Sequence, residues 1–141
     1  MVGNRSEPEP TKEARQSYAL PMTTILFVAD RQSVIDRVHA ALSTPDLRLI
    51  DHADPNTAAA EAAEQEVDGV LVDMQVGAMG AMAVTRAVRA ATADAPVPVT
   101  ILLDRDADAF LAKRSGAQNW LSKDFAAVDL RAAVLEAKTP A

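Results

Sequence analysis

From Thr24 onward, short apolar runs alternate with segments in which apolar residues recur at helical spacing. The runs are nearly continuous in Val, Ile and Leu, which is typical of strands covered on both faces. We predict strands over residues 25–28, 47–50, 69–73, 97–104 and 119–123, and helices over residues 33–42, 55–66, 81–91, 106–116 and 124–138. Because parallel strands need crossover connections, this alternation predicts a parallel sheet with helices on both faces.

Two helix ends carry clear boundary signals. Asp54 is predicted to cap the second helix, with Pro55 at its first position, and Gly116 is predicted to end the fourth. Helical spacing also predicts which residues face the core. They are Val34, Ile35, Val38, Ala41 and Leu42 in the first helix, Val84, Ala87, Val88 and Ala91 in the third, and Leu130, Ala133 and Val134 in the last.

The segment that follows the first predicted strand, ADRQSV, narrows the choice of fold. It lacks the glycines that let a pyrophosphate approach the backbone, so the dinucleotide-binding version of this architecture is disfavoured. We therefore predict an α/β, flavodoxin-like three-layer sandwich. Its five parallel strands are expected in the order 2-1-3-4-5, between five helices.

Composition excludes several classes of protein. The 141 residues suffice for one domain with its own core, and a 49% hydrophobic but only 4% aromatic content means that small aliphatic side chains build it. A net charge of −6 without clustered Lys and Arg argues against direct binding of nucleic acid. The chain has no cysteine and no apolar run near the roughly 18 residues of a transmembrane helix. We expect a soluble, cytoplasmic protein.

The two ends of the chain are predicted to lie outside the domain of residues 23–138. Residues 1–22 are polar and rich in Pro and Glu, so we expect a flexible N-terminal tail, and residues 139–141 form a short C-terminal tail. A small apolar group in the N-terminal tail could contact a partner; it consists of Tyr18, Ala19, Leu20 and Met22. The alternative is a linker whose apolar residues pack on the edge of its own sheet.

Three charged residues are predicted to meet at one edge of the sheet. Asp30 follows the first strand, Asp73 ends the third and Lys123 ends the fifth, and carboxyl ends of parallel strands share one edge. Adjacent carboxylates repel unless a cation such as Mg2+ lies between them, and a Lys ammonium suits a phosphate. Asp73 could therefore accept a phosphoryl group. The alternative is a solvated cluster of strand-end charges held by a salt bridge.

The motifs ILFVAD, GVLVDMQVGAM and GAQNWLSKDF resemble those of the response regulator receiver (CheY-like) domain, and the resemblance covers residues 24–138. It implies that Asp73 is the phosphoacceptor and that Lys123 contacts the phosphate. It also implies a Mg2+ site, formed by Asp30, Asp73 and the backbone carbonyl of Gln75. Arg89 and Trp120 fall on the Arg that commonly ends the third helix and on the fifth-strand aromatic residue.

Several positions depart from the family pattern around the expected metal site. Ala29 stands in place of the first acid of the terminal pair, so Mg2+ is expected to bind weakly. Gly77 replaces the usual Pro after the phosphoacceptor, and Gly80 and Ala81 replace an Asp-Gly pair. We therefore expect the backbone rigidity of this loop to differ from that of the family.

Other departures affect the expected conformational switch. Leu103 occupies the position of a Ser or Thr that reports phosphorylation by hydrogen bonding, and Leu cannot make that bond. Asp104 follows where the family has a small residue, and it would place negative charge beside an incoming phosphate. Asp124 replaces the Pro after Lys123 and removes the usual reason for a cis peptide. We expect an atypical receiver with a damaged switch.

No second domain follows residue 138, so we expect a stand-alone receiver-like protein that acts through a protein partner and is not an enzyme. The first hypothesis is an interaction module or accessory subunit. The Ala-rich, Arg-over-Lys composition is typical of actinobacteria, and the resemblance extends to a receiver-like protein associated with their respiratory complex I. That partner would hold the protein at the cytoplasmic face of the membrane.

Two other hypotheses come from different classes. The first is a working phosphotransfer receiver that takes phosphate from a histidine kinase on Asp73. The second is a small hydrolase of the same fold, which has little support because His39 and His52 are predicted to lie away from the site as surface or packing residues.

Overall fold

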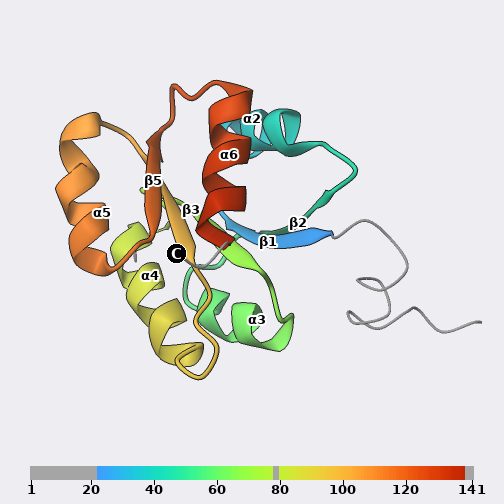
Figure 1. Cartoon of the computed structure of the whole chain (residues 1–141). Coiled ribbons are helices and arrows are strands. Elements are labelled where there is room, and N and C mark those ends of the chain that lie inside the picture. The colour runs from blue at the N-terminus through green and yellow to red at the C-terminus, as the bar shows by residue number, and fades with distance from the viewer. Residues whose placement is uncertain (1–21, 78–79, 139–141) are drawn as a thin grey trace, which may run out of the picture.

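The computed structural model describes residues 22–77 and 80–138 and contains a five-stranded sheet and five helices (Figure 1). The strands are β1 (Thr23–Val28), β2 (Leu47–His52), β3 (Gly69–Asp73), β4 (Val99–Leu103) and β5 (Asn119–Ser122). The helices are α2 (Gln32–Leu42), α3 (Ala58–Glu64), α4 (Gly80–Ala91), α5 (Ala109–Ser115) and α6 (Ala127–Lys138), and a 3₁₀ turn, η1 (Asp106–Asp108), precedes α5. Of the predicted N-terminal tail, only Met22 lies within the described residues.

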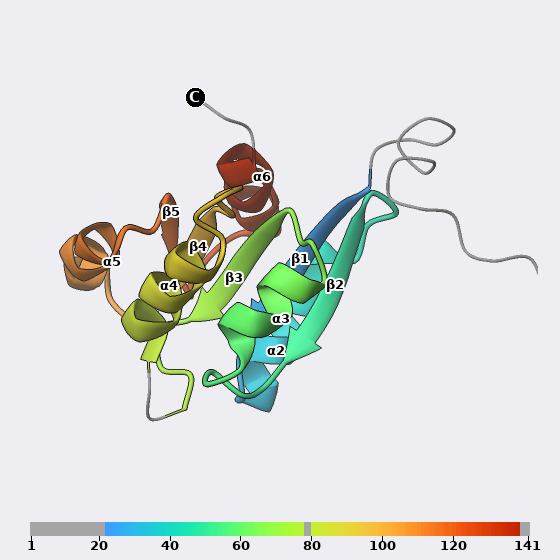
Figure 2. The same ribbon diagram turned by 90° about the horizontal axis from the view of Figure 1, so that it is seen from below.

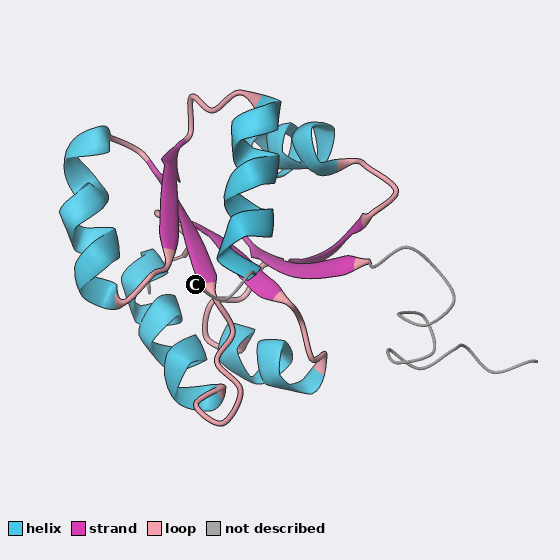
Figure 3. Ribbon diagram, in the orientation of Figure 1, coloured by secondary structure: helices cyan, strands magenta, loops and turns pink. Residues whose placement is uncertain are grey.

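All neighbouring strands are parallel, and their order is β2-β1-β3-β4-β5. The predicted flavodoxin-like fold and strand order are therefore confirmed. Helices α2 and α6 cover one face of the sheet, and α3, α4 and α5 cover the other (Figures 1 and 2). Figure 3 shows the three layers as strands between two sets of helices.

Alternate residues of the central strands point into two separate apolar clusters. In β1, Ile25 and Phe27 pack toward α2 and α6, whereas Leu26 and Val28 pack toward α3 and α4. All five residues of β3 are buried, which explains why its sequence is a continuous run and not an alternating pattern. The residues that follow the strands thus extend from a sheet whose central strands are buried on both faces.

Three helices, α3, α5 and α6, begin three residues later than predicted, and a 3₁₀ turn occupies the predicted first turn of α5. The Asp54 carboxylate accepts the Asn56 backbone N–H at 2.9 Å, so it stabilises a turn, and α3 begins only at Ala58. Helix α6 begins at Ala127, three residues after the predicted start. The prediction that Asp54 caps the helix is therefore wrong.

Smaller differences concern strand ends and helix faces. His52 is the last residue of β2, whereas the predicted strand ended two residues earlier. Ala91, predicted to face the core, is exposed at the end of α4. Thr85 is buried, and its hydroxyl is satisfied because it donates to the Ala81 carbonyl at 2.8 Å. The predicted inward faces of α2 and α6 are confirmed for Val38 and Leu130, which are fully buried.

Gly116 ends α5 as predicted. Its φ of +93° lies in the left-handed region, which costs side-chain-bearing residues strain. A Cβ here would also lie 1.7 Å from a guanidinium nitrogen of Arg89, whose side chain crosses this turn and donates to the Gly116 carbonyl at 3.3 Å. The positive φ therefore favours glycine here, whereas the exposed end of the Arg89 side chain can move aside.

Within residues 22–77 and 80–138, the structure has no helix of the length and apolar character that a membrane crossing requires.

A polar network fixes α6 to the turn before β2. The guanidinium of Arg131 donates to the Thr44 hydroxyl and the Asp46 carboxylate, each at 2.6 Å, and Thr44 donates to Asp46 at 2.8 Å. The hydrogen bonds from Arg131 and then Thr44 hold the pKa of Asp46 below its ordinary value of 3.8.

This lowered pKa predicts a pH-dependent contribution to stability. The stabilisation should be present above the ordinary pKa of 3.8 and be lost as the pH falls through the lowered pKa of folded Asp46. We expect Arg131→Met to lower Tm slightly at pH 6, and the difference from the unmodified protein to vanish under acid or high-salt conditions. Thermal unfolding across pH 2 to 6 measures this; exposed Arg48, replaced by Met, serves as control. A pH-independent difference would contradict the prediction.

Candidate functional site

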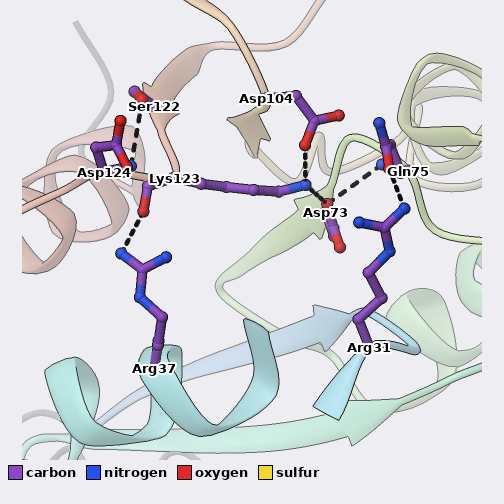
Figure 4. Close-up of polar contacts among 8 residues, drawn as sticks. All are labelled: Arg31, Arg37, Asp73, Gln75, Asp104, Ser122, Lys123 and Asp124. Carbon is purple, nitrogen blue, oxygen red and sulfur yellow. Dashed lines mark hydrogen bonds and ion pairs between the residues drawn. The ribbon is translucent and has the colours of Figure 1, made fainter. Parts of the chain in front are cut away.

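The charged residues at the carboxyl edge of the sheet lie around Asp73 (Figure 4). Asp73 ends β3, Asp30 follows β1 by two residues, and Lys123 comes directly after β5. Lys123 points from one side toward Asp73, while Asp104, directly after β4, contacts the same ammonium. The edge thus brings side chains from four strand ends into one region.

Asp73 is fully buried, with 0% of its surface exposed. Its Oδ1 atom lies 2.5 Å from Nζ of Lys123 and accepts the backbone N–H of Gln75 at 3.2 Å. Its Oδ2 atom is also buried but has no hydrogen-bond partner among the described residues. A buried carboxylate oxygen without a partner costs free energy, so this atom retains the capacity to bind a cation or to react.

Lys123 is held from both its backbone and its side chain. Its N–H donates to the Leu103 carbonyl at 2.9 Å, and its carbonyl accepts a hydrogen bond from Arg37 of α2. The Arg37 guanidinium also lies 5.0 Å from the centre of the Phe125 ring, so one side chain fixes the loop between β5 and α6. The ammonium itself contacts both Asp73 and Asp104.

Asp30 does not pair with Lys123; it anchors the loop after β3. Its Oδ2 accepts the Gly77 N–H at 2.9 Å, and Gly77 has a positive φ of +51°. Next to it, the guanidinium of Arg31 donates to the side-chain carbonyl of Gln75 (Figure 4). Asp30 and Arg31 therefore hold the chain that follows Asp73.

The residues around Asp73 offer oxygen ligands to a hard divalent cation, but few of these ligands are charged. The unpartnered Oδ2 of Asp73 is an oxygen of the kind that Mg2+ prefers. Against this, the part of the chain that the structure describes has no group of three or more His, Cys, Asp or Glu side chains suited to a metal. The buried methyl group of Ala29 supplies no ligand where the resemblance implies an acid.

The residues at the positions that the resemblance implies for a switch come from the end of β4, from β5 and from the segment after β5. Leu103 is 2% exposed and packs in the apolar cluster under α3, α4 and α5, against which Trp120 is partly buried. Asp124 is exposed, and its backbone N–H donates to the Ser122 hydroxyl at 3.2 Å. No cis peptide bond occurs among the described residues, which includes the bond before Asp124.

Two features of the site were not predicted from the sequence. Arg37 shows no motif, because its contact spans 86 residues of sequence and depends on how α2 packs beside α6. The shared contact of Lys123 with Asp73 and Asp104 was missed as well, although the position of Asp104 at a strand end was a usable signal.

The two histidines lie away from Asp73. Nε2 of His39 contacts the Asp51 carboxylate at 2.8 Å, and Nε2 of His52 contacts the Thr57 hydroxyl at 2.7 Å. Each has a structural partner on the α2, β2 and α3 side of the fold, which gives no support to a hydrolase.

A sequence profile described as the response regulator receiver domain matches residues 25–135. Together with the observed strand order, this match shows that the chain belongs to the receiver domain family of response regulators. A search of curated proteins finds no significant match.

Solved structures similar to this chain include receiver domains. The signal receiver domain of NarL from Mycobacterium tuberculosis is 24% identical, with a TM-score of 0.74, covering 84% of this chain and 98% of that one. The chemotaxis protein CheY4 of Vibrio cholerae is 24% identical, with a TM-score of 0.71 and coverages of 82% and 98%. The receiver domain of the sensor histidine kinase PA1611 from Pseudomonas aeruginosa, solved with a coordinated magnesium ion, is 24% identical, with a TM-score of 0.68 and coverages of 83% and 98%. At these identities the likeness concerns the fold.

Proposed function

We propose that this receiver domain is a protein interaction module, and that binding of its partner does not depend on phosphorylation of Asp73. The observation that carries this proposal is the buried Leu103 at the end of β4. The resemblance implies a hydroxyl there, which would move to bond a phosphoryl oxygen and so report the modification. The side chain of Leu103 has no hydrogen-bond donor. It is buried in the apolar cluster, so a movement toward a charged phosphoryl group would not be favourable.

The metal chemistry supports the same proposal. Asp30, Asp73 and the Gln75 backbone carbonyl are the groups that would hold Mg2+, which would neutralise charge on a transferred phosphoryl group. With two carboxylates and an occupied Asp30 oxygen, we expect weak binding. A Mg2+ titration followed by backbone amide shifts near Asp73 measures this affinity without any need for activity.

The proposed partner is a larger protein assembly, and respiratory complex I at the cytoplasmic face of the membrane is the specific candidate. The support for complex I is the resemblance and the Ala-rich, Arg-over-Lys composition. The polar N-terminal tail, with its apolar residues Tyr18 to Met22, is proposed as an additional tether to the same partner.

The test is a comparison of partner retention by two forms of the protein. We expect Asp73→Asn, which cannot form the acyl phosphate, to retain the same co-purifying proteins from native membranes and cytosol, in amounts within about two-fold of the unmodified protein. Quantitative mass spectrometry of the retained proteins is the measurement. Asp106→Asn, an exposed acid on η1, is the matched control. Selective loss of a partner from Asp73→Asn would contradict the proposal.

A phosphotransfer receiver that accepts phosphate from a histidine kinase is the second candidate. It is favoured by the buried Oδ2 of Asp73, which has no hydrogen-bond partner in the described part of the chain, and by the Lys123 ammonium 2.5 Å from Oδ1. These are the nucleophile and the cation that the chemistry would need.

A further inference from the structure

We propose that Asp104 is a built-in anion that occupies the Lys123 ammonium and thereby prevents Asp73 from accepting a phosphoryl group. Asp104 would be a positioning residue, because it acts on Asp73 only through Lys123. This inference concerns the reactivity of the site, so it goes beyond the proposed interaction function and does not depend on which partner is bound.

The geometry places one cation between two anions. Nζ of Lys123 lies 2.5 Å from Oδ1 of Asp73 and also contacts Oδ1 of Asp104 (Figure 4). The side chains of Lys123 and Asp104 are 14% and 24% exposed, so water screens these contacts only in part. Two of the three ammonium donors are therefore engaged by carboxylates, and the three side chains together carry a net negative charge.

Phosphoryl transfer to this site would require a rearrangement of these charges. With acetyl phosphate as donor, Oδ2 of Asp73 would attack phosphorus as the bond from phosphorus to the acetyl oxygen breaks. Acetate would leave with that electron pair, and the product would be an acyl phosphate whose terminal oxygens are negative. Those oxygens need a cation, yet Lys123 is already shared with Asp104, whose own carboxylate would face the arriving group and repel it.

The arrangement also explains how the partly exposed carboxylate of Asp104 is tolerated near the buried carboxylate of Asp73. Each carboxylate is stabilised by the same ammonium, so neither is left as an uncompensated charge. Replacing Asp104 alone leaves the Asp73 and Lys123 pair intact and balanced. The fold should therefore survive this replacement, while the ammonium gains a donor for an incoming anion.

The experiment compares acetyl phosphate labelling of Asp104→Asn and Asp104→Ala with that of the unmodified protein. The purified proteins are incubated with acetyl phosphate and Mg2+, and the phosphorylated fraction is followed by intact mass. We expect both variants to be labelled about ten-fold faster or more, since a charge that opposes the transition state is removed. The control Asp106→Asn should react like the unmodified protein, and adding Asp73→Asn to Asp104→Ala should abolish labelling.

A gain of reactivity is the deciding readout, because structural damage alone would not produce it. Labelling of both Asp104 variants no faster than that of the unmodified protein would overturn the inference. Loss of the cooperative thermal transition in both variants would overturn it too, because the remaining Asp73 and Lys123 pair is proposed to keep the site in place. Partner retention is not part of this assay, so its outcome is separate from that of the proposed function.

Discussion

Lys123→Met is expected to lower the free energy of unfolding by about 3 to 5 kcal/mol, because it would leave a buried carboxylate without its cation. Asp73 is fully buried, and Lys123 is its only ion-pair partner among the described residues. Without the ammonium, Asp73 and Asp104 would face each other as like charges. A loss of this size should lower Tm by about 10 °C or more.

Controls separate the loss of charge from the loss of a side chain. Lys113→Met removes a Lys from the exposed surface of α5 and should change stability by less than about 0.5 kcal/mol. Adding Asp73→Asn to Lys123→Met removes the buried charge itself and should recover most of the lost stability. Denaturant unfolding of the three variants is the measurement. If Lys123→Met is nearly as stable as the unmodified protein, the buried ion cluster contributes little.

Gly77→Pro, which restores the residue that the family has after the phosphoacceptor, is expected to destabilise this protein by about 2 to 4 kcal/mol. Proline fixes φ near −65°, whereas Gly77 has a φ of +51°. Proline also lacks the N–H that Gly77 donates to the Asp30 carboxylate at 2.9 Å. The loop would have to change conformation and release Asp30.

Gly77→Ala is the matched variant for this loop. It keeps the N–H, but it places a Cβ at positive φ and 2.9 Å from Cγ of Pro55, so we expect a smaller loss of about 1 to 2 kcal/mol. Denaturant unfolding ranks the two variants, and amide exchange at Gly77 in the unmodified protein reports the hydrogen bond to Asp30. A Gly77→Pro variant as stable as the unmodified protein would show that the loop has no preference for this conformation.

The fold was predictable because strand and helix patterns in this chain are strong and mutually consistent. The continuous apolar character of β3 reflects its burial on both faces, and the ADRQSV segment after β1 disfavoured the dinucleotide-binding version of the architecture. Helix starts were less predictable. The turn at Asp54 and the loop held by Arg37 depend on local and distant hydrogen bonds that compete with the helix and leave little mark in the sequence.

The charged edge was predictable as a location but not as an arrangement. Strand ends indicated that Asp30, Asp73 and Lys123 lie at one edge, and the structure places them there. Which carboxylates share the ammonium depends on side-chain positions across four strands, and here Asp104 takes the contact while Asp30 anchors Gly77. The sequence showed Asp104 as added negative charge; its direct contact with Lys123 required the structure.

The most direct test of a receiver that works without a phosphorylation switch is an NMR spectrum of the backbone amides. It is recorded on isotope-labelled protein before and after adding acetyl phosphate with Mg2+. We predict shifts confined to residues near Asp30 and Asp73, the proposed Mg2+ ligands, with no change across α5, β5 and α6, and an intact mass that stays that of the unmodified chain. Stoichiometric addition of one phosphoryl group on Asp73, together with shifts spreading through α5, β5 and α6, would contradict the account.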